Sequence, residues 1–285
     1  MKALITGAGG QLGQALVIGA PDDAEIAAYG SADLDICDRD AVFAAVRKAK
    51  PDIIINAAAF TKVDDAETRA EQAEAVNRGG VENLALAAAA EGARLAHVST
   101  DFVFDGRTST PYRPQDATAP LSVYGRTKRD GELAAGPDAL IVRTGWVYGP
   151  RGGNFVATML RLMRERDALG IVDDQIGTPT CTTSLAATIW TLASAGHRGV
   201  WHYSDSGVAS WYDFAVAIME EGLAAGLLSR EIAIKPIATA DYPTPARRPR
   251  FSVLDKRETF AALGQPAPHW RINLRRTLEA MKSDG

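Results

Sequence analysis

The sequence has little cysteine, no long apolar run and no excess of positive charge, and each lack excludes a class of protein. The only cysteines, Cys37 and Cys181, are far apart and lack metal-ligand spacing, so we expect free thiols in a reducing compartment. No apolar stretch approaches the length of a membrane span, and the run over residues 1–6 is too short for a signal peptide. We therefore expect a cytoplasmic protein with no membrane partner.

The charge balance excludes a general affinity for polyanions. The formal net charge is −4 over 285 residues, so no positive field covers the chain that could hold nucleic acid or an anionic membrane. Any anionic ligand must be bound by local cations and backbone amides. The hydrophobic share of 46% is that of an ordinary globular protein with a full core.

Glycine is concentrated just after the first apolar segment. A short strand is expected over residues 2–6, followed by Gly7, Gly10 and Gly13 and then by a helical stretch over residues 14–17. In a strand–turn–helix unit such glycines let the backbone turn tightly and approach a pyrophosphate, and the helix amino terminus adds amides and its dipole. A plain turn is the alternative. The flanking strand and helix favour dinucleotide binding.

The second expected strand, residues 25–29, ends in Gly30 and Ser31 without the carboxylate that would bind an adenosine ribose. The choice between NADH and NADPH is therefore left open. Asp35 and Ile36 follow, and a carboxylate beside an aliphatic side chain could bind and flank an adenine. Asp35 could equally cap a helix over residues 39–48.

Strands and helices alternate through the first half of the chain. Further strands are expected over residues 52–56, 94–100 and 138–144, with a helix over residues 76–91. This alternation predicts an α/β fold with a doubly wound parallel sheet of the Rossmann type. Residues 1–150 would form a dinucleotide-binding domain with the catalytic residues. Residues 151–285 would mainly form a smaller substrate-binding lobe, with some segments returning to the main sheet.

Tyr124 and Lys128 are four residues apart and would lie one turn apart on the same face of a helix. A phenol with a pKa of about 10 becomes a better acid when a cation stabilises its phenolate. Alone the pair is weak evidence, because any surface helix can carry it. Thr100 ends a strand, where its hydroxyl could bond a carbonyl substrate or only its own backbone. His97 is expected to face the core and not to act as a base.

Four motifs in this order and spacing resemble the extended short-chain dehydrogenase/reductase family: TGAGGQLG at residues 6–13, NAAA at 56–59, STDFVFDG at 99–106 and YGRTK at 124–128. Three more resemble the members of that family that reduce keto sugars joined to dTDP: NAAAFTKVD at 56–64, RTGWVY at 143–148 and DQIGTPT at 174–180. The likeness covers nearly the whole chain. It implies reduction of the 4-keto group of dTDP-4-dehydro-L-rhamnose to dTDP-L-rhamnose, for surface polysaccharide, with NADPH or NADH as cofactor.

The resemblance also implies individual roles. Tyr124 would protonate the carbonyl oxygen, Lys128 would hold the nicotinamide ribose and lower the pKa of Tyr124, and Thr100 would orient the carbonyl. The residues expected to bind cofactor are Gly7, Gly10, Gln11, Leu12, Gly13, Asp35, Ile36, Ala58, Ala59, Phe60, Thr61, Tyr124 and Lys128. Those expected to bind substrate are Thr100, Asp101, Trp146, Asn154 and Arg248. Phe102 departs from the family, since a tyrosine is common there.

The second half contains helical segments over residues 155–166, 182–193, 211–221, 256–263 and 272–281. Asn154, Ser210 and Asp255 are the expected caps of three of them, and residues 182–184 of another. A proline-rich loop over residues 241–250 is dense in arginine. We expect Arg248 to bind a pyrophosphate, because guanidinium groups fork onto phosphates. The alternative is a surface loop whose arginines pair with nearby acids.

Two other functions remain open. A nucleotide-sugar dehydratase or epimerase would use the same triad with bound NAD, but a dehydratase commonly needs a glutamate where this chain has Phe102. A non-catalytic dinucleotide-binding regulatory module would have no need of Tyr124 and Lys128. Some relatives dimerise through carboxylate-bound magnesium, yet residues 14–16 offer no acid. Magnesium is therefore unsupported by the sequence, and a homodimer stays open.

Overall fold

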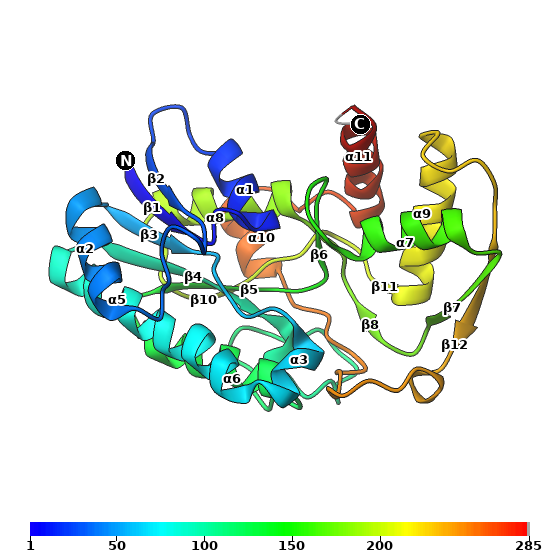
Figure 1. Ribbon diagram of the computed structural model, residues 1–285, viewed down its shortest axis with the longest axis horizontal. Helices are drawn as coiled ribbons and strands as arrows, with labels where there is room; N and C mark the ends of the chain where they lie inside the picture. The colour runs from blue at the N-terminus through cyan, green and yellow to red at the C-terminus, as the bar shows by residue number, and fades with distance from the viewer. Residues whose placement is uncertain (284–285) are drawn as a thin grey trace.

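A computed structural model describes residues 1–283, and its centre is a six-stranded parallel sheet (Figure 1). The strand order is β10-β5-β4-β3-β1-β2. The strands are β1 (Lys2–Thr6), β2 (Glu25–Tyr29), β3 (Ile53–Asn56), β4 (Arg94–Thr100), β5 (Leu140–Thr144) and β10 (Gly199–His202). Every residue of β3 and β5 is buried, as strands covered on both faces require. The predicted doubly wound α/β fold is confirmed.

Helices cover both faces of this sheet (Figure 1). One face packs against α1 (Gln11–Ile18), α8 (Thr182–Ser194) and α10 (Arg257–Leu263). The other face packs against α2 (Arg39–Ala49), α5 (Gly80–Glu91) and α6 (Val123–Ala135). Both α8 and α10, like β10, come from beyond residue 150. The second half of the chain therefore completes the main layer.

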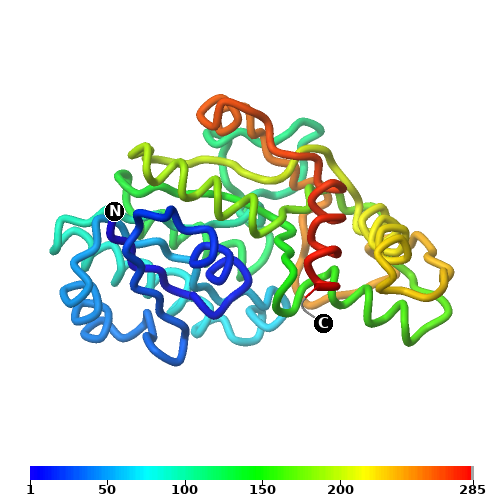
Figure 2. Tube along the Cα trace, turned by 90° about the horizontal axis from the view of Figure 1, so that it is seen from above, coloured from blue at the N-terminus to red at the C-terminus, as the bar shows by residue number. Residues whose placement is uncertain are grey.

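A smaller lobe lies beyond the carboxyl edge of the sheet. Its helices are α7 (Phe155–Glu165), α9 (Trp211–Ala224) and α11 (Trp270–Ser283), and Figure 2 shows α11 between the main layer and α9. Three two-stranded pairs complete it: β7 (Ala168–Val172) with β12 (Ala233–Ile237), β8 (Ile176–Gly177) with β11 (Ala209–Ser210), and β6 (Val147–Tyr148) with β9 (Thr180–Cys181). Its own core surrounds the buried rings of Tyr148 and Phe214.

The remaining helical segments are short: α3 (Val63–Thr68), α4 (Ala70–Glu74), the π-helical turn η1 (Ala75–Gly79), and the 3₁₀ turns η2 (Asp101–Val103) and η3 (Thr239–Asp241). The π turn replaces the start of the helix expected over residues 76–91. No helix among the described residues is long and apolar enough to cross a membrane.

Several expected helix ends are wrong by a few residues. Asp38, not Asp35, caps α2 through a bond from the Ala41 amide, because Asp35 lies a full turn too early. Helix α8 has no side-chain cap. Asp255 accepts a bond from the Arg257 amide but precedes the first helical residue by two positions, and α11 begins at residue 270, not 272. Asn154 and Ser210 do cap α7 and α9.

Candidate active site

The carboxyl ends of β1, β3 and β4 meet where the chain switches from one side of β1 to the other. In open α/β sheets ligands bind at such a switch point. The glycine turn follows β1, the alanine-rich segment over residues 57–61 follows β3, and Thr100 ends β4. Segments that carry most of the expected site residues therefore share one edge of the sheet.

The glycine turn is built so that a backbone or ligand can approach it closely. Gly7 has φ +70°, and a Cβ there would come 2.5 Å from the Ala58 nitrogen. A Cβ on Gly13 would overlap the Gly7 carbonyl oxygen. Gly10 precedes α1 without a side-chain cap, and the first amides of a helix have no partner within it. These features fit a dinucleotide pyrophosphate at the amino terminus of α1.

A carboxylate that the sequence analysis did not single out lies at the end of β2. Asp33 folds back in a turn, and its Oδ2 accepts a bond from the Gly30 amide at 3.0 Å, at the end of β2. The signal was an aspartate three residues after the glycine that ends a strand. Asp35 accepts from the Cys37 amide and is exposed, whereas the Ile36 side chain is buried in the core beside Gly80.

The segment that follows β3 is fixed by Asn77, another residue that the sequence analysis missed. Asn77 lies in η1 and is 1% exposed. Its Oδ1 accepts from the Phe60 amide at 2.8 Å, and its Nδ2 donates to the Phe60 carbonyl and to Thr127 Oγ1 on α6. One amide thus ties the expected cofactor segment over residues 58–61 to the helix that carries Tyr124.

Tyr124 and Thr100 are brought together by close packing of α6 on η2. Ser122 caps α6, and a Cβ at Gly125 would overlap the Phe102 carbonyl oxygen, so only glycine allows this approach. The Tyr124 phenol forms a side-chain hydrogen bond with Thr100, and its ring meets the edge of Phe102 at 5.6 Å. Thr100 Oγ1 also contacts Asp101 Oδ1 at 3.1 Å.

The pKa of Tyr124 is shifted opposite to the expected direction. Burial raises it to about 12, Asp101 adds to this, and the bond with Thr100 opposes it. The expected lowering by Lys128 is absent because the amine points into the sheet, where Nζ donates to the Val98 carbonyl at 2.7 Å. Burial also lowers the pKa of Lys128 to about 8. Tyr124 is therefore held as a protonated phenol.

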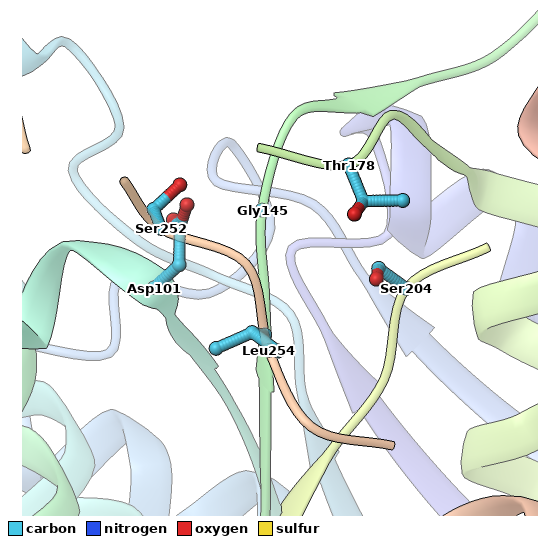
Figure 3. A pocket seen from close by; sticks show the side chains of 6 residues that line it. All are labelled: Asp101, Gly145, Thr178, Ser204, Ser252 and Leu254. Atoms are coloured by element: carbon cyan, nitrogen blue, oxygen red, sulfur yellow. The ribbon is translucent and has the colours of Figure 1, made fainter. Parts of the chain in front are cut away.

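Asp101, which follows Thr100 in the chain, lines a small pocket (Figure 3). Its side chain is beside that of Ser252, and a Cβ on Gly145 would come 2.6 Å from its carboxyl carbon. Burial raises the pKa of Asp101 to about 6, against the opposing bonds from Ser252 and Thr100. The carboxyl group contacts protein side chains here, so its contact with a sugar stays a prediction. Ser252 and Gly145 carry no sequence signal for this pairing.

Trp146 has a strained backbone conformation, with φ 50°. Its ring stacks on Trp211 at 3.5 Å between centroids, and Trp211 Nε1 donates to Gln175 Oε1. Trp211 also lines a cavity of about 230 Å³. The cavity is lined by Phe155, Gly170, Ile171, Val172, Gln175, Trp211, Tyr242, Thr244 and Arg248.

Arg248 lines this cavity and pairs with an acid, and its contact with a pyrophosphate stays a prediction. Its Nη1 and Nη2 bind Asp64 of α3 at 3.1 and 2.7 Å, and Nη1 also donates to Thr244. The guanidinium lowers the pKa of Asp64. The pair joins the proline-rich loop to the main layer at the cavity wall.

Asn154 uses its whole amide inside the protein. Its Oδ1 accepts from the Ala157 amide at the start of α7, and its Nδ2 donates to Gln11 Oε1 and to the Gly149 carbonyl, each at 2.9 Å. Gln11 returns a bond to the Gly153 carbonyl. The structure therefore makes Asn154 a bridge between the glycine turn and the smaller lobe, and its contact with substrate stays a prediction.

The described residues contain no cluster of three or more His, Cys, Asp or Glu side chains that could hold a metal ion. The arrangement that they do contain combines a protonated phenol, a neighbouring hydroxyl and a buried amine beside a dinucleotide-type glycine turn. Such a set can protonate an oxygen while a reduced nicotinamide acts on the carbon that bears it.

Comparison with known proteins agrees with this chemistry. The family model described as RmlD substrate binding domain matches residues 1–283. A dTDP-4-dehydrorhamnose reductase of Aggregatibacter actinomycetemcomitans is 43% identical over 96% of this chain and 97% of its own. A spore coat polysaccharide biosynthesis protein of Bacillus subtilis is 41% identical, with 99% and 98% covered. The crystal structure of the Bacillus anthracis dTDP-4-dehydrorhamnose reductase in complex with NADP superposes with a TM-score of 0.91 at 34% identity, covering 97% and 98%.

Proposed function

This chain belongs to the RmlD substrate binding domain family, and from that premise we propose that it reduces the 4-keto group of dTDP-4-dehydro-L-rhamnose to dTDP-L-rhamnose. NADPH or NADH, when bound, supplies the hydride. The observation that carries the proposal is the contact of Tyr124 with Thr100 at the carboxyl end of β4, beside the glycine turn. The likeness to relatives with this name extends over nearly the whole chain.

Tyr124 is the proposed acid. Its raised pKa keeps the proton on the phenol until negative charge develops on the substrate oxygen, and the O–H bond then breaks toward that oxygen. Thr100 orients the carbonyl through its hydroxyl, at the point where it already contacts Tyr124. Lys128 is the proposed ligand of the nicotinamide ribose, for which its amine would have to turn away from the Val98 carbonyl. The products of the step are a sugar hydroxyl and a tyrosine that must regain a proton.

The cofactor would lie across the carboxyl edge of the sheet. Amides at the start of α1 are proposed to bind its pyrophosphate, and the adenosine end would extend toward β2. There Asp33 and the exposed Asp35 are the carboxylates available to a ribose. Asn77 would hold residues 58–61 against the nicotinamide side.

The cavity beside Trp211 is the proposed site for the nucleotide part of the substrate. It is largely apolar, has the Trp211 and Phe155 rings on its wall, and carries Arg248 at its edge. A guanidinium can bind a pyrophosphate oxygen while it keeps one contact with Asp64, because it has five donors in a fork. Trp146, stacked on Trp211, would separate this cavity from the sugar.

The test is incubation of the purified chain with dTDP-4-dehydro-L-rhamnose and either NADPH or NADH. We expect loss of reduced-nicotinamide absorbance in proportion to a product that has gained two hydrogen atoms. Sugar conversion without net cofactor consumption would instead indicate a dehydratase or epimerase with bound NAD. Cofactor binding without any turnover would indicate a regulatory module and would end the proposal.

A further inference from the structure

A buried chain of polar side chains runs from Lys128 into the centre of the sheet. Lys128 Nζ lies 3.3 Å from His97 Nε2, and His97 Nδ1 lies 3.0 Å from Asn56 Nδ2. Asn56 Oδ1 in turn accepts from Thr6 Oγ1 at 2.7 Å. All four side chains are almost completely buried, and Thr6, Asn56 and His97 are direct register partners on β1, β3 and β4. The roles proposed above do not explain why these four buried side chains are polar.

The backbone fixes the orientation of the Asn56 amide. The Ala58 amide lies 3.0 Å from Asn56 Oδ1, and a backbone N–H can only donate, so this atom must be the oxygen. The other atom of the amide is therefore the nitrogen, and it donates to His97 Nδ1. A nitrogen that accepts a hydrogen bond carries no proton. His97 Nδ1 is thus the bare nitrogen of the ring.

It follows that the proton of His97 is on Nε2. Burial lowers the pKa of His97 well below its usual value, so the ring is neutral and keeps one proton. With Nδ1 bare, that proton points from Nε2 toward Lys128. The tautomer is set by Asn56, whose own orientation is set by the Ala58 backbone.

A neutral amine at Lys128 satisfies this arrangement and an ammonium does not. An amine can donate one N–H to the Val98 carbonyl and accept the Nε2–H of His97 with its lone pair. An ammonium has no lone pair and would face an N–H with another N–H. Glu132, one turn further along α6, favours the ammonium, but Arg143 of β5 binds both of its carboxylate oxygens.

We propose that His97 is a positioning residue that acts through Lys128: locked by Asn56 as the Nε2–H tautomer, it stabilises Lys128 as an amine in the protein without cofactor. Its consequence for turnover rests on the proposed function. When Lys128 is an ammonium it can release a proton to restore Tyr124 and remain as an amine bonded to His97. One N–H bond of Lys128 breaks and one O–H bond of Tyr124 forms.

The first test reads the tautomer directly in the full-length chain without added nucleotide. Long-range ¹⁵N–¹H NMR separates protonated from bare ring nitrogens, and the sequence has only four histidines. The spectrum of a His97→Phe variant identifies the His97 signals by their loss. We expect a protonated Nε2 and a bare Nδ1 at neutral pH. A protonated Nδ1 would overturn the proposal.

The second test follows the lysine side chains by ¹³Cε NMR across a pH titration. His97→Phe removes the opposing N–H, and we expect the Lys128 midpoint to rise by about one pH unit, the size of one hydrogen bond that favours a single protonation state. His97→Gln, which can accept from Asn56 and donate to Lys128, should restore the wild-type midpoint. An unchanged midpoint in folded His97→Phe would refute the proposal.

Lys256 is the internal control for this titration. Its pKa is also lowered by burial to about 8, but its Nζ donates to the Asp205 carbonyl, away from β4. The Lys256 midpoint should be the same in the wild type, His97→Phe and His97→Gln. A shift of the Lys256 midpoint together with that of Lys128 would indicate a general structural change and would count against the proposal. Neither test uses substrate. Both the tautomer test and the lysine titration could therefore still be interpreted if the proposed reductase activity were not found.

Discussion

Replacing Glu132 by glutamine should lower the free energy of unfolding by about 3 to 5 kcal/mol. The Glu132 carboxylate on α6 accepts from Arg143 Nε at 2.8 Å and Nη2 at 2.7 Å, and from Ser99 Oγ on β4. Both charged side chains are only 6% exposed. Water therefore cannot replace the lost partner, and a buried guanidinium without a carboxylate bears its full desolvation cost.

The measurement is urea unfolding followed by tryptophan fluorescence, with equal m-values required before the two midpoints are compared. Glu165→Gln on α7 is the matched control. Glu165 pairs with Arg161 one turn away at 2.8 Å, but these side chains are 52% and 59% exposed, so we expect a loss below about 0.5 kcal/mol. Equal small losses at both positions would refute the argument that burial makes the Glu132 pair indispensable.

Four further predictions concern the site and its surroundings. Tyr124→Phe should lower kcat/KM for keto-sugar reduction by about 10²- to 10⁴-fold while NADPH still binds, and near-normal turnover would remove the phenol from the role of acid. Gly13→Ala should lower the melting temperature and Gly9→Ala should not, because a Cβ at the first position meets backbone and at the second meets open space; equal melting temperatures would contradict this. Asp33→Ser should raise the Kd for NADH more than that for NADPH, since a carboxylate there favours a ribose hydroxyl and repels a 2′-phosphate; equal changes would place Asp33 outside the cofactor site. Burial raises the pKa of Asp205 to about 7, so the free energy of unfolding of the wild type falls as pH rises from about 4 toward 7. Urea unfolding at about pH 4 and about pH 7 should show that the free energy of unfolding of Asp205→Asn rises relative to that of the wild type over this range.

The sheet and its glycine turn could be predicted because each follows from a local pattern. Continuous apolar runs such as residues 53–55 require cover on both faces, and the alternation with helices then makes the strands parallel. The glycines at residues 7 and 13 are needed where backbone meets backbone. Both signals lie within a few residues of the structure that they specify.

The less predictable features depend on where a polar side chain finds its partner. Sequence spacing puts Tyr124 and Lys128 on one face of a helix, but it does not say that the Lys128 amine bends toward the Val98 carbonyl and leaves the phenol with a raised pKa. The Asn154 amide donates to Gln11, which lies 143 positions earlier in the chain. Pairings over such distances in sequence are set by the assembled fold and leave no local pattern.

Two buried polar contacts hold the helix of the proposed triad against β4. His97 and Ser99 are two residues apart on β4, or about 6.6 Å along a strand, and they contact Lys128 and Glu132, which are four residues apart on α6, or about 6 Å along a helix. These polar contacts fix the helix lengthwise on the strand. Tyr124 is brought to the Thr100 hydroxyl at the start of the same helix, where a Cβ on Gly125 would overlap the Phe102 carbonyl oxygen. The acid is therefore positioned by contacts buried beneath it, which is why changes at Glu132 or His97 should alter catalysis without touching a ligand.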